Sequence, residues 1–223
     1  MKPVSASTNG KPAIIFDLGG VLLDWDPRYL YRKLFAGDEV AMNKFLDEID
    51  FFVWNQQQDA GRAFEIAVAE ACNRFPQYCE LIKAYPARYE ESLSGPIWDS
   101  VAILQSLKEA RYSLYGLSNW PAEMFYRILP TYPFLGWFQD IVISGEVGLN
   151  KPDPRIFQIL LNRVDRPASD CLLIDDSQKN IQAAQDLGFQ TILFQSPAQL
   201  REELIRKKLM GSSLIPEQSS PLG

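Results

Sequence analysis

Short runs of consecutive apolar residues recur along this chain. The first is Ala13-Ile14-Ile15-Phe16, and similar runs occupy residues 112–117, 141–143, 171–174 and 191–194. Continuous apolarity over so few residues is typical of strands that are buried on both faces of a parallel sheet. We therefore predict a strand at each run.

Segments of helical periodicity lie between these runs. Apolar residues recur at intervals of about three or four in residues 101–108, 157–164 and 181–187. Pro154 lies in the first turn of the second segment, and Ser177 and Gly188 mark the limits of the third. Strands that alternate with helices predict an α/β fold with a doubly wound parallel sheet.

The segment from Pro27 to Gly95 has a different pattern. It contains no strand-like run, and its apolar residues keep helical spacing. Breaks are expected at Gly37, Gly61, Pro76 and Pro86. Because this block follows directly on the first strand, we expect an all-helical cap over the edge of the sheet. The predicted organisation is an α/β core of residues 11–25 and 96–209, a helical cap of residues 26–95, and a loose C-terminal tail of residues 210–223.

Composition narrows the possible chemistry. The chain has 223 residues, with 22 Lys and Arg against 28 Asp and Glu, a net charge of −6. Without a basic surplus, neither nucleic acid nor an anionic membrane is an expected partner. The absence of histidine excludes Ser-His-Asp and Cys-His hydrolases and histidine-ligated zinc sites. Catalysis must then use carboxylates, lysine, hydroxyl groups or thiols.

Cysteine usage and hydropathy predict a cytoplasmic protein. Cys72, Cys79 and Cys171 are odd in number and their spacing fits no zinc pattern, so we expect reduced thiols. Cys72 and Cys79 lie seven apart on a helical pattern and are expected to be small core residues. No apolar run approaches the roughly 18 residues needed to span a bilayer, and the first residues lack the apolar stretch of a secretion signal.

Polar residues directly follow the predicted strands. Asp17 follows the first, Ser118 and Asn119 follow residues 112–117, and Asp175 and Asp176 follow residues 171–174. In an open parallel sheet, ligands bind beyond the carboxyl ends of the strands. Carboxylates gathered there repel one another unless a cation compensates them, and Mg²⁺ is the usual cation where phosphate is the other ligand.

Lys151 is expected near the same edge of the sheet, just before a helix that begins at Pro154. Its charge can neutralise an anionic substrate together with the nucleophile. The hydroxyl of Ser118 and main-chain N–H groups at Ser118 and Asn119 can bind phosphate oxygens.

Four segments in order resemble the motifs of the haloacid dehalogenase-like (HAD) hydrolase superfamily. They are IIFDLGGVL at 14–22, LSN at 117–119, KPDP at 151–154 and LIDDS at 173–177, the last followed by Asn180. The helical insert after the first segment resembles the subfamily I cap of that family. The resemblance covers residues 11–209, and four ordered motifs are far more specific than any one alone.

The resemblance implies a role for each matching residue. Asp17 would be the nucleophile that forms an aspartyl-phosphate, and Lys151 would stabilise the charge of the phosphoryl group. Ser118, Asn119 and Gly20 would bind that group. Mg²⁺ would be held by Asp17, Asp176, the carbonyl of Gly19 and, through water, Asp175, while Asn180 is expected to support these ligands. The implied substrate is a small phosphorylated metabolite, and the implied assembly is a monomer or homodimer.

Gly19 departs from the pattern of most phosphatases of this family. They carry a second aspartate two residues after the nucleophile, where it protonates the leaving group, and losing such a group costs about 10² to 10⁴ in rate. Sugar 1-phosphate phosphatases with the same Asp-Leu-Gly opening are the subgroup that the chain resembles. We expect substrates with good leaving groups, such as anomeric sugar phosphates or acyl phosphates. Asp24, Asp26 or Asp59 are alternative acids.

Within the cap, Trp54 and Arg62 are candidate substrate contacts. The alternative is an interhelical turn in which Trp54 packs in the interior of the cap.

The resemblance implies a Mg²⁺-dependent phosphatase, and two other functions remain open at this point. A metal-independent 2-haloacid dehalogenase would use the same nucleophile. However, the negative charges of the retained Asp175-Asp176 pair would repel the carboxylate of such a substrate. A non-catalytic binding domain would be consistent with Gly19.

Overall fold

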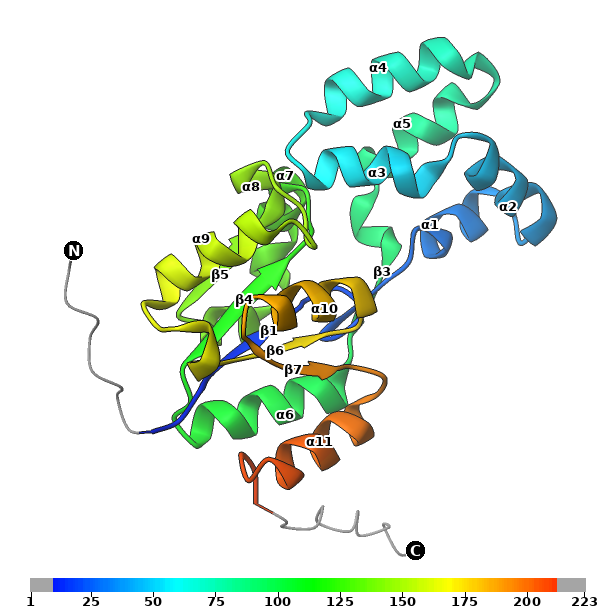
Figure 1. The fold of residues 1–223 in the computed structure, drawn as a ribbon. Helices are drawn as coiled ribbons and strands as arrows, with labels where there is room; N and C mark the ends of the chain where they lie inside the picture. The colour runs from blue at the N-terminus through cyan, green and yellow to red at the C-terminus, as the bar shows by residue number, and fades with distance from the viewer. Residues whose placement is uncertain (1–9, 212–223) are drawn as a thin grey trace, which may run out of the picture.

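The computed structural model describes residues 10–211 and places a five-stranded parallel sheet at its centre (Figure 1). The strand order is β5-β4-β1-β6-β7. The strands are β1 (Ala13–Phe16), β4 (Leu114–Ser118), β5 (Asp140–Ile143), β6 (Cys171–Asp175) and β7 (Gln190–Leu193). Each of the five predicted strands is confirmed, within two residues at either end.

Alternate residues of the central strand face two separate cores. Ile14 and Phe16 belong to one apolar cluster, which includes residues of α6 (Trp98–Glu109), α7 (Ala122–Ile128) and α11 (Pro197–Arg206). Ile15 belongs to the other, with residues of α9 (Pro154–Val164) and α10 (Gln178–Asp186). A strand covered on both faces must be apolar at every position, and this is the reason for the continuous runs. The doubly wound α/β fold is confirmed.

Helix ends follow the local signals. Asp153 caps α9 by accepting a hydrogen bond from the main chain of Arg155, and Pro154 lies in its first turn. Ser177 precedes α10, and Gly188 follows the end of that helix with φ +88°, a conformation that glycine adopts without a steric penalty.

Residues between β1 and α6 form a group of helices to one side of the sheet (Figure 1). These are α1 (Pro27–Leu34), α2 (Glu39–Glu48), α3 (Phe51–Asp59), α4 (Phe64–Arg74) and α5 (Cys79–Ala87). Aromatic rings fill the space between them: Tyr31, Phe51 and Tyr85 are buried and contact one another. This arrangement agrees with a helical cap, whose limits stay a prediction.

Two features of this region differ from expectation. The block is not free of strands, because its end lies in β3 (Leu93–Pro96). This strand pairs antiparallel with β2 (Leu23–Trp25), which precedes the block, where the chain leaves and re-enters the core. β3 has the sequence LSGP, which shows no apolar run, so only the approach of the two connections reveals it. The break expected at Pro86 is absent, because this proline lies within helix α5.

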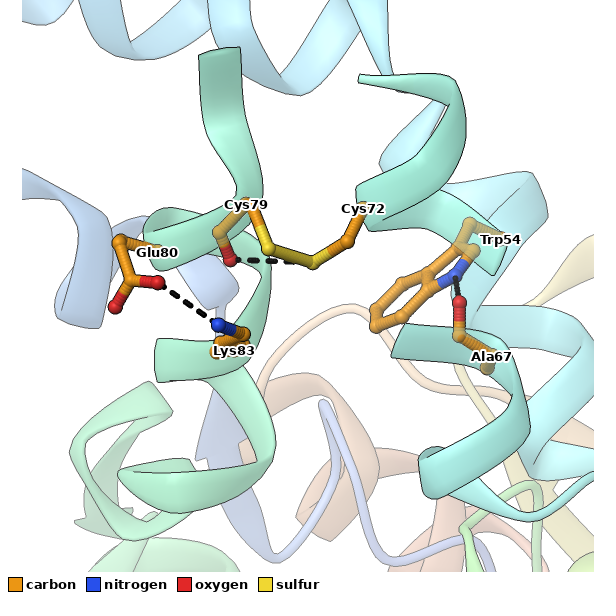
Figure 2. The surroundings of a disulfide bond; sticks show 6 residues. All are labelled: Trp54, Ala67, Cys72, Cys79, Glu80 and Lys83. Atoms are coloured by element: carbon orange, nitrogen blue, oxygen red, sulfur yellow. Dashed lines mark hydrogen bonds and ion pairs between the residues drawn. A yellow bond between two sulfur atoms is a disulfide. The ribbon is translucent and has the colours of Figure 1, made fainter. Parts of the chain in front are cut away.

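Cys72 and Cys79 form a disulfide (Figure 2). The prediction of reduced thiols is therefore wrong for this pair. Pro76 begins a short 3₁₀ turn between α4 and α5, and the reversal brings the two Cα atoms to 4.5 Å. Cys171 is a buried free thiol. Because disulfides are typical of oxidising environments, the bond lends no support to a cytoplasmic location, which stays a prediction.

The ends of the chain fall largely outside the described residues, including positions 212–223 of the predicted tail. Within residues 10–211, none of the helices has the length and apolarity needed to cross a membrane.

Candidate active site

Asp17, Ser118 and Asp175 meet at the carboxyl ends of three neighbouring strands. β1 lies between β4 and β6, and Phe16 pairs with Ile174, so the aspartates that follow these two residues lie side by side. Ser118 is the last residue of β4 on the other side. All three residues are buried. The parallel order of the sheet thus brings together segments that are distant in the sequence.

Both oxygens of the Asp17 carboxylate accept hydrogen bonds. Oδ1 accepts from the main-chain N–H of Leu18 at 2.7 Å and from Ser118 Oγ at 3.0 Å, and Oδ2 lies 2.9 Å from Lys151 Nζ. Burial raises the pKa of Asp17 to about 7, since the charge of Lys151 only partly offsets burial and the repulsion from Asp175 and Asp176. Contacts to both of its oxygens fix the orientation of the Asp17 carboxylate, and its ionisation is unfavourable without further positive charge nearby.

Lys151 is buried between two carboxylates. Its Nζ donates to Asp175 Oδ2 at 2.7 Å and to the carbonyl oxygen of Leu117 at 2.8 Å, and it pairs with Asp17. Burial alone lowers the pKa of Lys151, but the charges of Asp17 and Asp175 outweigh it and raise the pKa. The lysine is therefore a fixed positive charge beside Asp17 and not a solvated surface group.

Asn119 fixes the loop that carries Lys151. Its side chain accepts from the main-chain N–H of Lys151 at 2.7 Å and donates to the carbonyl of Lys151 at 3.0 Å. With the amide engaged in this way, the group that Asn119 still offers is its main-chain N–H. Within residues 10–211 this N–H and that of Gly19 donate no hydrogen bond, so both are free to bind an anion.

The two aspartates after β6 differ in their surroundings. Asp175 is fully buried and accepts from the main-chain N–H of Ser177 at 2.9 Å, from Asn180 Nδ2 at 2.9 Å and from Lys151. The Asn180 side chain thus orients Asp175, as expected. Asp176 is exposed, and partial burial together with the charge of Asp175 raises its pKa. Asp176 is therefore the carboxylate of this pair with capacity for another ligand.

The three aspartates form a candidate metal site. Asp17, Asp175 and Asp176 each offer one carboxylate oxygen, and these oxygens all lie within 4.8 Å of one another. An all-oxygen donor set of this kind suits Mg²⁺. The raised pKa values of Asp17 and Asp176 are a further sign that the cluster lacks positive charge, which a divalent cation supplies.

Gly20 has a part in this site that the sequence did not indicate. Its main-chain N–H donates to the carbonyl of Leu23 at 2.9 Å, so it is not free for a substrate. Its φ is +75°, and a Cβ placed on it would lie 2.2 Å from Asp176 Oδ2. The missing side chain leaves the room that the Asp176 carboxylate occupies.

Gly20→Ala is therefore expected to weaken Mg²⁺ binding about tenfold, because the added methyl displaces a ligand. The measurement is the rise in melting temperature with Mg²⁺ concentration. Gly37→Ala is the matched control: Gly37 has φ +86°, and a Cβ added to it would meet nothing within 4 Å, so it carries the backbone strain without the displacement. Equal effects of the two substitutions would contradict this account.

A cavity of about 60 Å³ adjoins Gly19 and Asn119. Its remaining lining residues are Trp25, Asn55, Asp59, Tyr89 and Trp120. Of the alternative acids, Asp59 lines this cavity. Asp24 instead accepts from Tyr29 Oη at 2.8 Å, and Asp26 caps α1 through the main chain of Arg28 at 2.8 Å.

The structure does not bring Trp54 and Arg62 to this cavity. Trp54 is buried among the cap helices, where its Nε1 donates to the carbonyl of Ala67 (Figure 2). Arg62 pairs with Glu70 and donates to Gln57. Both line a separate cavity of about 290 Å³. The interior position of Trp54 is the one that the sequence offered as the alternative.

Sequence reasoning missed the lining residues Trp25, Asn55, Tyr89 and Trp120. One signal was available for Asn55, which precedes Asp59 by one helical turn and donates to both of its oxygens at 3.3 Å. The aromatic residues carry no such signal, because nothing in their spacing separates a cavity wall from a core.

Metal-free protein is expected to lose stability as the pH rises from about 5 to about 8. Burial raises the pKa of Asp59 to about 7, and that of Asp17 is also about 7, both from 3.8. Between these values the folded state binds more protons than the unfolded state, so the free energy of unfolding falls with rising pH. Melting temperatures in EDTA test this. Asp59→Asn should flatten the curve, and stability that rises over this range would contradict the two shifts.

Comparison with known proteins assigns the chain to a family. It matches the family described as haloacid dehalogenase-like hydrolase over residues 14–194, which is most of its length. The sesquiterpene phosphatase astK of Aspergillus oryzae is 26% identical over 182 residues, 79% of this chain and 86% of that protein. A D-ribitol-5-phosphate phosphatase of Bacteroides thetaiotaomicron is 25% identical over 201 residues, 86% of this chain and 95% of that protein. The chain also matches drimenol cyclase drtB of Aspergillus calidoustus at 26% identity, but it spans only 35% of that protein's length.

A solved structure has the same fold. A HAD family enzyme from Bacteroides thetaiotaomicron, in complex with magnesium and inorganic phosphate, has a TM-score of 0.64 and 23% identity, covering 83% of this chain and 95% of that chain. The matched residues 14–194 contain all four motif segments and the whole parallel sheet apart from Ala13, the first residue of β1. The chain therefore belongs to the haloacid dehalogenase-like hydrolase family.

Proposed function

We propose that this chain is a Mg²⁺-dependent phosphatase that hydrolyses a small phosphate ester through an aspartyl-phosphate on Asp17. The observation that carries the proposal is the environment of one carboxylate. Asp17 is held by Ser118 and Lys151 and lies within 4.8 Å of carboxylate oxygens of Asp175 and Asp176. Two relatives that match most of the chain are named as phosphatases, which supports the same activity.

Each residue has a role that follows from its position. An Asp17 oxygen attacks phosphorus and the bond to the leaving oxygen breaks. Lys151 Nζ offsets the negative charge at Asp17 and the phosphoryl group, which is the main requirement of phosphoryl transfer. The free N–H groups of Gly19 and Asn119 bind phosphoryl oxygens. Ser118 Oγ donates its one hydrogen to Asp17 Oδ1, and it donates to a phosphoryl oxygen once it has turned away from Asp17. Water then attacks phosphorus and releases phosphate from Asp17.

Mg²⁺ fits the oxygens of this site, and when bound it supplies positive charge to the phosphoryl group. Asp17 and Asp176 would hold it directly, with the Gly19 carbonyl, which accepts no hydrogen bond within residues 10–211. Asp175 is saturated by Lys151, Asn180 and Ser177, which favours a contact through water.

The carboxylate cluster favours phosphatase over dehalogenase activity. A 2-haloacid carries its own carboxylate, and Asp175 and Asp176 beside Asp17 would repel it unless a cation intervened. A purely non-catalytic domain would need no oriented nucleophile, whereas Asp17 has a partner at each oxygen.

The cavity beside Gly19 favours a sugar or polyol phosphate as substrate. Three of its lining residues carry a buried polar atom that has no hydrogen-bond partner within the described chain: Trp25 Nε1, Asn55 Oδ1 and Trp120 Nε1. Two of these atoms are donors and one is an acceptor, and hydroxyl groups can serve both kinds. An apolar leaving group such as a terpene chain would leave them unsatisfied, at a cost of about 1–3 kcal/mol each.

A substrate screen tests the proposal. The panel contains p-nitrophenyl phosphate, sugar and polyol phosphates, a prenyl phosphate, and the haloacids chloroacetate and 2-chloropropionate, each with Mg²⁺ and with EDTA. We expect phosphate release only with Mg²⁺, and faster from polyol than from prenyl phosphates. Halide release that EDTA does not diminish would establish a dehalogenase instead, and inactivity on every ester would refute phosphatase activity.

A further inference from the structure

The proposed reaction needs a proton at the leaving oxygen, and the groups around Asp17 do not supply it. Gly19 has no side chain. Lys151 donates to three oxygens, of Leu117, Asp17 and Asp175, and so has no N–H left for a leaving group. Asp175 is saturated by its donors, and Asp176 belongs to the candidate metal site. The proton must therefore come from another titratable group, close to Gly19, which follows Asp17 by two residues.

Asp59 borders the cavity next to Gly19 from the cap side. It lines the cavity of about 60 Å³ together with Gly19 and Asn119. So small a volume places its walls close together, which leaves room for a leaving oxygen or a water molecule between them. Among the three alternative acids Asp24, Asp26 and Asp59, it is the one in this position.

Contacts with the core fix the end of α3 that carries Asp59. Ser144 Oγ, directly after β5, donates to the main-chain carbonyl of Asp59 at 2.6 Å. Asn150, next to Lys151, donates from Nδ2 to the carbonyl of Gln56 at 2.7 Å. Gly61 packs so closely that a Cβ on it would lie 2.9 Å from the carbonyl oxygen of Gly145. The position of the carboxyl group relative to the strand ends is thus set by direct hydrogen bonds.

The Asp59 carboxyl group is buried and has no cationic partner within residues 10–211. Its side chain accepts only from Asn55 Nδ2, and the residue is 9% exposed. Asp26 and Asp38, two aspartates of the same region, have structural roles instead, because each caps a helix by accepting a hydrogen bond from a main-chain N–H group. Burial without a counter-charge raises the pKa of Asp59 to about 7, so both protonation states are accessible near neutral pH.

We propose that Asp59 is the proton donor to the leaving group and the base that activates water, in place of the side chain missing at Gly19. This rests on the proposed phosphatase function. As Asp17 attacks phosphorus and the bond to the leaving oxygen breaks, the protonated Asp59 gives its proton to that oxygen, which leaves an alcohol and the Asp59 carboxylate. In the second step the carboxylate takes a proton from the attacking water, the bond from phosphorus to Asp17 breaks, and Asp59 is protonated again.

Two aryl phosphates of similar shape test this assignment with the full chain and Mg²⁺. Phenol is a much weaker acid than p-nitrophenol, so only phenyl phosphate needs a proton donor. For Asp59→Asn we expect kcat/KM to fall roughly 10²- to 10⁴-fold with phenyl phosphate and less than about tenfold with p-nitrophenyl phosphate. Intact-mass analysis should show phosphorylated Asp17 accumulating in this variant with p-nitrophenyl phosphate, because the attack of water is slowed. Asp47→Asn, an exposed aspartate of α2, is the matched control and should behave as wild type.

The outcomes separate the two proposals. The difference between the substrates is measured within one variant, so a loss of folded protein cannot produce it, and Asn retains an oxygen for the bond from Asn55. If wild type hydrolyses both esters but kcat/KM of Asp59→Asn falls by the same factor with both, or with neither, the assignment of Asp59 is overturned while the phosphatase function stands. If wild type hydrolyses neither of these esters nor any other phosphate of the substrate panel with Mg²⁺, both proposals fail.

Discussion

Asp17→Asn is expected to lower turnover of p-nitrophenyl phosphate by roughly 10⁴- to 10⁶-fold, the range seen when an enzyme loses its nucleophile. An amide oxygen is a poor nucleophile, and the substitution changes no other group that binds the phosphoryl moiety. Initial rates with Mg²⁺ measure the effect. A parallel measurement is the acid-quenched phosphoenzyme, which should form in wild type and be absent from the variant.

Folding is expected to survive this substitution. The raised pKa of Asp17 means that its ionised form destabilises the metal-free fold, and Asn removes that charge while Lys151 keeps Asp175 as a partner. The melting temperature in EDTA should therefore not fall. Turnover close to that of wild type would show that Asp17 is not the nucleophile, whatever its position beside the acidic pair.

Lys151→Met is expected to cost about 3–5 kcal/mol of unfolding free energy near neutral pH, because it strips the counter-charge from two buried carboxylates. It should also lower turnover by about 10²- to 10³-fold, the effect of removing a group that stabilises charge in the transition state. Urea unfolding and initial rates measure the two effects.

A double variant separates the effect of the uncompensated buried charges on stability from the effect of losing a long side chain. Adding Asp175→Asn to Lys151→Met removes one of the two buried carboxylates that have lost their counter-charge. The double variant should regain part of the stability but not the activity. Lys83→Met is a matched control, since Lys83 pairs with Glu80 on the surface of α5 (Figure 2), where an ion pair contributes about 0–1 kcal/mol. If Lys151→Met is no more destabilising than Lys83→Met, the buried charges are compensated by other means.

The parallel sheet could be predicted because its strands are enclosed on both faces. Residues such as Ile14, Ile15 and Phe16 are fully buried, and total burial requires an unbroken apolar run that a single sequence displays. β3 lacks this signal: its residues are only partly buried, and it exists because β2 passes alongside it. The disulfide was missed for a related reason. A break at Pro76 was predicted, but the direction of the turn, which brings the Cα atoms of Cys72 and Cys79 to 4.5 Å, depends on how α4 and α5 pack.

The acidic residues at the carboxyl ends of the strands could be predicted from the amino-acid sequence. In a parallel sheet the residues that follow the strands lie at the same edge, so recognising the strands was enough to bring Asp17, Ser118 and Asp175 together. The residues that line the neighbouring cavity could not be predicted in this way and are known from the fold alone. The cavity wall is made by side chains from separate helices and loops, among them Asp59 and Trp120, and their approach depends on how the end of α3 docks on Ser144 and Asn150. That docking is a relation between distant surfaces, and no local pattern of residues encodes it.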